Sequence, residues 1–204
     1  GTLGSAAAST PATYSNPLDV AIPAGGQVES CADPTTFYDP ASQLWYTYCT
    51  ADPLNDADRT SGGDFNFHLV PTLRSADLMH WTYLGDAFNS RPAYATATAG
   101  LWAPEIEYYP EASSGKYHLY YTVTDTTLPG GGAAIGVATS DSPAGPWTHA
   151  GAPVVEPHAA DCCPGSRRAV IDPEVLRTSG NDYIYYGSYF GGISARVLSK
   201  DGMH

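Results

Sequence analysis

The sequence predicts an all-β protein built from consecutive blades of a β-propeller. Residues that form turns and strands dominate, with 21 Gly, 17 Pro and 15 Tyr among 204 residues. Helical periodicity is weak along the whole chain, so we expect no long helix. A strand–turn–strand pattern occurs three times, with a period of about 70 residues. Four antiparallel strands per repeat, with the repeats in series, are typical of propeller blades.

Each repeat begins with a Tyr-rich hairpin. The paired strands are expected at residues 32–38 with 44–48, 103–109 with 117–121, and 171–176 with 183–186. The first two repeats continue with a third strand, an acidic turn and a short strand entered by a tryptophan: residues 67–73 then Trp81, and residues 134–139 then Trp147. A β-sandwich with chance Tyr-rich hairpins is the alternative, and three copies in one order disfavour it.

Charge and hydropathy exclude several classes of partner. The formal net charge is −12, which makes the chain a poor ligand for nucleic-acid phosphates or anionic membranes. No apolar run reaches the roughly 18 residues of a membrane-spanning helix. We therefore expect no nucleic-acid and no membrane partner. Residues 1–27 are interpreted as a leading segment whose first 13 residues are small and uncharged, and residues 28–204 as the propeller region.

The four cysteines favour an oxidising, extracellular location. Cys31 and Cys49 flank a turn and fall nearly opposite each other, which makes a cross-strand disulfide plausible. Cys162 and Cys163 are adjacent, and they could pair with each other or elsewhere, because four cysteines allow three pairings. Reduced thiols in a cytosolic protein are the alternative. No Cys-x-x-Cys or paired-His spacing accompanies them, so we assign no metal ligands.

Acidic residues occur where the innermost strand of each repeat begins. Asp33 and Asp172 lie 139 positions apart, two periods of the repeat, and Glu105 follows Pro104 in the second repeat. The starts of innermost strands converge at the mouth of a propeller channel, so we expect three carboxyl groups to meet there. Converging carboxylates shift one another's pKa values and can divide the roles of acid and base, as glycoside hydrolysis requires. Turn initiation is the alternative for an Asp-Pro pair.

Three motifs together resemble glycoside hydrolase family 43. They are Asp33-Pro34, Trp102-Ala103-Pro104-Glu105 and Ile171-Asp172-Pro173, and the stretches 140–147 and 186–193 are also similar to that family. The resemblance runs from about Val28 to the end of the sequence. It implies a five-bladed propeller that acts on arabinose- and xylose-containing polysaccharides.

The resemblance also implies residue roles. Asp33 matches the general base, and Asp172 matches the second aspartate, which raises the pKa of the acid and positions it. Trp102 is expected beside the sugar subsite, with Phe190 as a further substrate contact. Glu105 stands where the family usually has Asp, and it is expected to contact the substrate. The general acid of the family is a Glu that opens the fourth blade, and no residue here matches it.

The expected function is a secreted glycosidase that inverts arabinofuranosyl or xylosyl linkages. Two alternatives stay open: a catalytically silent propeller that binds carbohydrate, and a retaining fructan-type hydrolase with Asp33 as nucleophile. No cofactor is required. The resemblance implies a structural calcium ion in the channel, with ligands that do not come from this chain.

The length sets a further expectation. At about 70 residues per blade, 204 residues supply roughly the first two and a half to three of five blades. An open half-propeller would expose sheet edges and core, which soluble proteins avoid. We therefore expect a second polypeptide, from a cleaved precursor or a separate gene, to complete the ring and supply the acid Glu.

Overall fold

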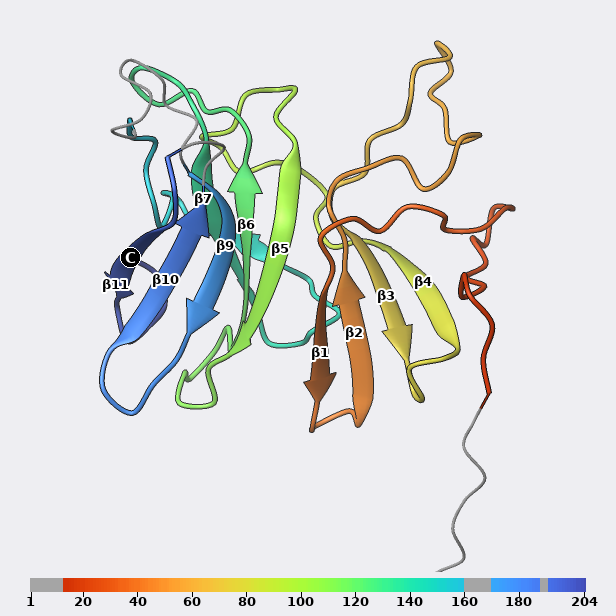
Figure 1. Ribbon diagram of the computed structural model, residues 1–204, viewed down its shortest axis with the longest axis horizontal. Helices are drawn as coiled ribbons and strands as arrows, with labels where there is room; N and C mark the ends of the chain where they lie inside the picture. The colour runs from red at the N-terminus through yellow and green to blue at the C-terminus, as the bar shows by residue number, and fades with distance from the viewer. Residues whose placement is uncertain (1–12, 160–169, 188–190) are drawn as a thin grey trace, which may run out of the picture.

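Three antiparallel sheets make up the computed structural model, which describes residues 13–159, 170–187 and 191–204 (Figure 1). Within these residues there is no helix, which confirms the all-β prediction. Each sheet is a meander in which strands that follow one another in sequence are hydrogen-bonded neighbours. Three residues singled out from the sequence, Cys162, Cys163 and Phe190, lie outside the described residues.

The first sheet has the order β1-β2-β3-β4. Its hairpin turn is fixed by Asp39, whose carboxylate accepts the backbone N–H groups of Ala41 and Ser42. The expected third strand at residues 67–73 is wrong in its start, because β3 begins only at Pro71 after a long loop that ends at Val70 in the left-handed region (φ 64°). The strands are β1 (Thr35–Asp39), β2 (Leu44–Tyr48), β3 (Pro71–Ser75) and β4 (Trp81–Asp86).

The second and third sheets repeat this plan. The second sheet has the order β5-β6-β7-β8, and the described part of the third has the order β9-β10-β11. The strands are β5 (Leu101–Tyr108), β6 (Tyr117–Val123), β7 (Ala134–Ser140), β8 (Thr148–His149), β9 (Ile171–Leu176), β10 (Asp182–Gly187) and β11 (Ser194–Leu198). Both tryptophan-led strands occur where the sequence indicated, since β4 begins at Trp81 and β8 directly follows Trp147.

The sheets pack face to face, and their first strands lie together. β5 contacts β1 on one side and β9 on the other, an arrangement that Figure 1 also shows. Buried tyrosines fill the space between the first two sheets, and their hydroxyls find polar partners across it. Tyr117 donates to Asp39 Oδ1 (2.6 Å) and Tyr48 donates to the Pro143 carbonyl (2.5 Å). Aliphatic side chains, including Ile135, Val175 and Ile184, fill the second interface.

The leading segment covers the outer face of the first sheet. Val20 is buried against Leu73 and Cys49. Cys31 and Cys49 form the predicted disulfide, with their Cα atoms 4.8 Å apart. The segment that precedes β1 is therefore joined covalently to the residues that follow β2. Among the described residues there is no helix with the length and apolar character needed to cross a membrane.

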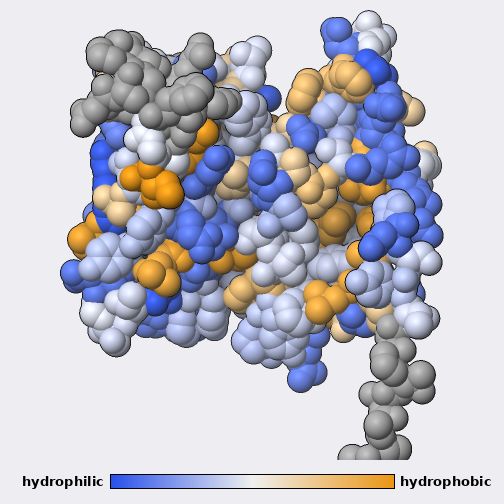
Figure 2. Space-filling view, in the orientation of Figure 1, coloured by the Kyte–Doolittle hydropathy of each residue, from blue (hydrophilic) through white to orange (hydrophobic). Residues whose placement is uncertain are grey.

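The outer face of the third sheet is exposed. Leu176 on β9 and Val197 on β11 both lie opposite Tyr183 of β10, and they are 50% and 61% exposed. Hydrophobic patches are visible over this sheet in Figure 2. The opposite face of the same sheet is buried against the second sheet, so the third sheet is covered on one side only.

Candidate active site

Three residues in the left-handed region stand at equivalent points of the three sheets. They are Asp33 (φ 45°), Ala103 (φ 43°) and Asp172 (φ 58°), each followed by a proline and each located where the first strand of its sheet begins. Such a conformation is unfavourable for a residue with a Cβ, by roughly 1–2 kcal/mol. Its recurrence every 69 or 70 residues indicates a geometry that the packing of the sheets imposes.

The structure corrects the predicted place of Glu105. The residue of the second sheet that is equivalent to Asp33 and Asp172 is Ala103, and Glu105 lies two residues further along β5. There its carboxyl group accepts a hydrogen bond from the Thr35 hydroxyl (3.0 Å). The expectation of three acidic groups at the mouth is therefore wrong. The three equivalent positions carry two carboxyl groups and the small side chain of Ala103.

The two aspartates interact electrostatically. Partial burial raises the pKa of Asp172, and the negative charge of Asp33 raises it further. Both side chains are exposed, so both are accessible from solvent. A carboxyl pKa raised by a neighbouring carboxylate is typical of sites that bring carboxyl groups together for catalysis.

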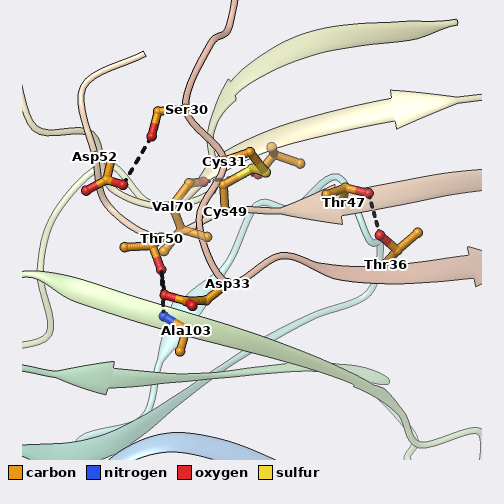
Figure 3. The surroundings of a disulfide bond; sticks show 11 residues. Ser30, Cys31, Asp33, Thr36, Thr47, Cys49, Thr50, Asp52, Val70 and Ala103 are labelled. Carbon is orange, nitrogen blue, oxygen red and sulfur yellow. Dashed lines mark hydrogen bonds between the residues drawn. A yellow bond between two sulfur atoms is a disulfide. The ribbon is translucent and has the colours of Figure 1, made fainter. Parts of the chain in front are cut away.

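A threonine hydroxyl fixes each junction between neighbouring sheets. Thr50, just after β2, donates to Asp33 Oδ2 (3.1 Å) and accepts the N–H of Ala103 (2.9 Å), as Figure 3 shows. Thr122 on β6 accepts the N–H of Asp172 (2.8 Å) in the same way. Each hydroxyl thus holds the left-handed residue of the next sheet, and Thr50 also orients the Asp33 carboxylate.

Trp102 directly precedes Ala103 at the start of β5. Its side chain is 38% exposed and its indole lies against Gly100, where a Cβ would come within 2.4 Å of Trp102 Nε1. Only glycine at position 100 therefore leaves room for the indole in this orientation. A partly exposed aromatic ring at the start of an inner strand is suited to contact the apolar face of a sugar.

A second layer of carboxyl groups lies deeper along the inner strands. Burial raises the pKa of Glu105 to about 8, with further contributions from the negative charges of Glu174 and Glu107 that outweigh its bond from Thr35. Burial likewise raises the pKa of Glu107 to about 7, although the guanidinium of Arg177 opposes this shift. Glu105 therefore favours the neutral form at pH 7, whereas Glu107 is close to half protonated, and this limits the negative charge inside the sheet stack.

The described residues contain no group of three or more His, Cys, Asp or Glu side chains arranged to hold a metal ion. Accordingly, no metal ligand is assigned in this part of the chain.

Sequence reasoning singled out Asp33, Asp172 and Trp102 as candidates but did not identify Thr50 and Thr122. The repeat contains a signal for both threonines. Thr50 ends the triplet Tyr-Cys-Thr and Thr122 ends the triplet Tyr-Tyr-Thr, 72 positions apart. The alignment of Ala103-Pro104 with the two Asp-Pro pairs would also have placed Glu105 correctly.

Comparisons of this chain with family models and with curated proteins point to the same family. The family model described as "Glycosyl hydrolases family 43" matches residues 59–204. The chain is 30% identical over 165 residues to an arabinoxylan arabinofuranohydrolase of Bacillus subtilis, an alignment that covers 73% of this chain and 30% of the relative. It is also 30% identical over 154 residues to an extracellular endo-α-(1→5)-L-arabinanase of Thermotoga petrophila, covering 63% and 31% of the two chains. The chain thus spans about a third of these relatives.

Solved structures share the fold. An α-L-arabinofuranosidase of Clostridium thermocellum superposes with a TM-score of 0.60 at 27% identity, covering 84% of this chain and 52% of that one. An α-L-arabinanase of Cellvibrio cellulosa superposes with a TM-score of 0.59 at 22% identity, covering 87% and 50%, and shows likeness of fold alone.

Proposed function

The chain belongs to glycosyl hydrolases family 43, and we propose from this premise that it forms part of a glycosidase that cleaves arabinofuranosyl linkages of plant polysaccharides with inversion. The observation that carries the proposal is the pair Asp33 and Asp172, presented at equivalent left-handed positions on either side of Ala103. The negative charge of Asp33 raises the pKa of Asp172, which supports a shared site for the two carboxyl groups. Names of the relatives, which refer to arabinoxylan and arabinan, support arabinose over xylose as the sugar.

In this mechanism Asp33 is the general base. Its exposed carboxylate, oriented by Thr50, accepts a proton from a water molecule as the water attacks the anomeric carbon. The bond to the leaving oxygen breaks on the opposite face of the sugar, and a carboxylic acid protonates that oxygen. We propose that this acid is a Glu located outside the 204 residues.

Asp172 and Trp102 support the reaction. A negative charge on Asp172 disfavours ionisation of a neighbouring carboxylic acid and so keeps the general acid protonated. The indole of Trp102 provides the wall against which the sugar rests. The mechanism needs no cofactor, and the calcium ion implied by the resemblance is proposed to take its ligands from residues outside this chain.

The remaining blades complete the same proposal. We propose that the three sheets are consecutive blades of a five-bladed propeller, and that a further polypeptide segment packs on the third sheet. The exposed Leu176 and Val197 support this, because an apolar sheet face of this kind is normally covered. The Cys31–Cys49 disulfide and the extracellular relatives support secretion.

The test is hydrolysis of 4-nitrophenyl α-L-arabinofuranoside. Its leaving group departs without protonation, so the rate of hydrolysis reports on the general base. Asp33→Asn is expected to lower kcat by about 10²- to 10⁴-fold, the usual contribution of a general base. Asp19→Asn, an exposed aspartate of the leading segment, is the matched control and should leave the rate unchanged. Equal, near-zero rates in wild type and Asp33→Asn would instead favour a silent binding propeller. Product stereochemistry by NMR separates inversion from the retaining alternative.

A further inference from the structure

We propose that a cleft on the rim of the first sheet is a distal binding site for a neutral glycan chain. This cleft, here called the rim cleft, has a volume of about 410 Å³ and lies between the Glu29–Ser30 segment and the β2–β3 loop. Phe65 and Phe67 form one part of its lining, and acidic side chains form another. The proposal rests on the proposed function, and it assigns a substrate contact outside the catalytic pair.

The two phenylalanines are the first reason. Phe67 is 59% exposed and Phe65 is 39% exposed, although Phe is among the residues most often buried. The guanidinium of Arg59 lies 3.4 Å from the centroid of the Phe65 ring and braces it. Neighbouring exposed aromatic rings that border a cleft mark a binding surface more often than isolated surface residues do.

The loop that carries these rings is held firmly. His68 bridges two carboxylates, with Nε2 2.8 Å from Asp58 Oδ2 and Nδ1 2.8 Å from Asp86 Oδ1. The backbone N–H of Asn66 donates to the Asp58 carbonyl (3.0 Å). Since the loop is fixed at Asn66, between the phenylalanines, and at His68, directly after them, their exposure is a stable feature of the fold. Such a surface is pre-organised for a ligand.

The polar lining selects the ligand class. Glu29, Asp52 and Asp56 line the rim cleft, so its ionised groups accept hydrogen bonds and do not donate them. A hydroxyl-rich ligand supplies the matching donors, while the apolar faces of its rings pack on phenylalanine. The local acidic groups and the net charge of −12 repel uronates and other anionic glycans. A neutral pentose polymer satisfies both conditions.

The rim cleft is next to the catalytic aspartate. Ser30 lines the cleft and precedes Asp33 by three residues, so their backbones are separated by at most about 11 Å. Ser30 donates to Asp52 Oδ2 (3.1 Å). Asp52 lies two residues after Thr50, whose hydroxyl donates to Asp33. Figure 3 shows both bonds close to the Cys31–Cys49 disulfide. A polymer bound at Asp33 can therefore extend into the rim cleft, whereas a single sugar cannot fill both.

The experiment compares polymer and monosaccharide substrates in Phe67→Ala. Removal of one stacking ring is expected to raise the KM for debranched arabinan about 3- to 10-fold, while kinetics on 4-nitrophenyl α-L-arabinofuranoside stay unchanged. Tyr14→Ala removes an aromatic ring that is 65% exposed elsewhere and is the matched control. Affinity electrophoresis in arabinan, with Asp33→Asn as background, measures binding without turnover.

The outcomes separate the two proposals. Weaker retardation of Phe67→Ala than of Tyr14→Ala supports the rim cleft, even if the wild type hydrolyses nothing. Equal retardation and equal KM for arabinan in the two variants would overturn it, whatever the activity on the aryl substrate. Stronger binding of polygalacturonate than of arabinan would overturn the assignment of a neutral ligand.

Discussion

Replacing Thr50 by valine removes one hydroxyl from the junction of the first two sheets and keeps its shape. In the structure this buried hydroxyl accepts the N–H of Ala103 at 2.9 Å and donates to Asp33 Oδ2 at 3.1 Å. Ala103 is itself buried, so its N–H loses its partner without gaining water, which costs about 1–3 kcal/mol. Asp33 is exposed and can turn toward solvent, so the lost bond to its carboxylate affects stability little.

We therefore expect the free energy of unfolding to fall by about 2 kcal/mol in Thr50→Val, measured by urea denaturation. Thr50→Ser keeps the hydroxyl and loses a single methyl group, about 0.8 kcal/mol. Catalysis should separate the variants further, because the valine leaves the Asp33 carboxylate without its orienting donor. Valine should lower kcat on the aryl arabinofuranoside about 10- to 100-fold with KM nearly unchanged, and serine should restore most of the rate.

The repeated geometry provides an internal check. Thr122→Val removes the acceptor of the Asp172 N–H and should destabilise the protein less than Thr50→Val, because Asp172 is exposed and its N–H can bond to water. Serine keeps the hydroxyl and valine lacks it. Equal stability and equal kcat in Thr50→Val and Thr50→Ser would therefore refute the role of the hydroxyl.

Three further substitutions test other parts of the structure. Gly100→Ala forces the indole of Trp102 aside. It should raise the KM for the aryl arabinofuranoside several-fold and shift the tryptophan fluorescence, and unchanged emission would contradict the contact. Tyr117→Phe removes the 2.6 Å bond to buried Asp39 and should lower the free energy of unfolding by about 1–3 kcal/mol in urea, with a loss below 0.5 kcal/mol counting against it. Glu105 has its pKa raised from 4.5 to about 8, so the folded state holds its proton more tightly and stability falls as pH rises through this range. The urea midpoint should therefore fall less between pH 5 and pH 8 in Glu105→Gln than in the wild type. An equal fall in the two proteins would argue against a neutral carboxyl group at position 105.

The sequence was sufficient for features that depend on local order. Strand pairs in a meander are close in the chain, so the alternation of Tyr-rich runs with turns located the hairpins of all three sheets. The Asp-Pro pairs at positions 33 and 172 were found because they recur at the same point of the repeat. The Cys31–Cys49 pairing also followed from a short loop around one turn.

Tertiary structure alone decided how the sheets meet. The sequence pattern predicted Glu105 at the mouth, because it is the acidic residue of the second repeat nearest to the start of the inner strand. The left-handed conformation of Ala103 instead places Glu105 two residues deeper, against Thr35. That conformation is unfavourable for an isolated residue and is maintained by Thr50 from another sheet, 53 residues away. Local propensity therefore could not reveal it, because the energy that holds it comes from contacts between blades.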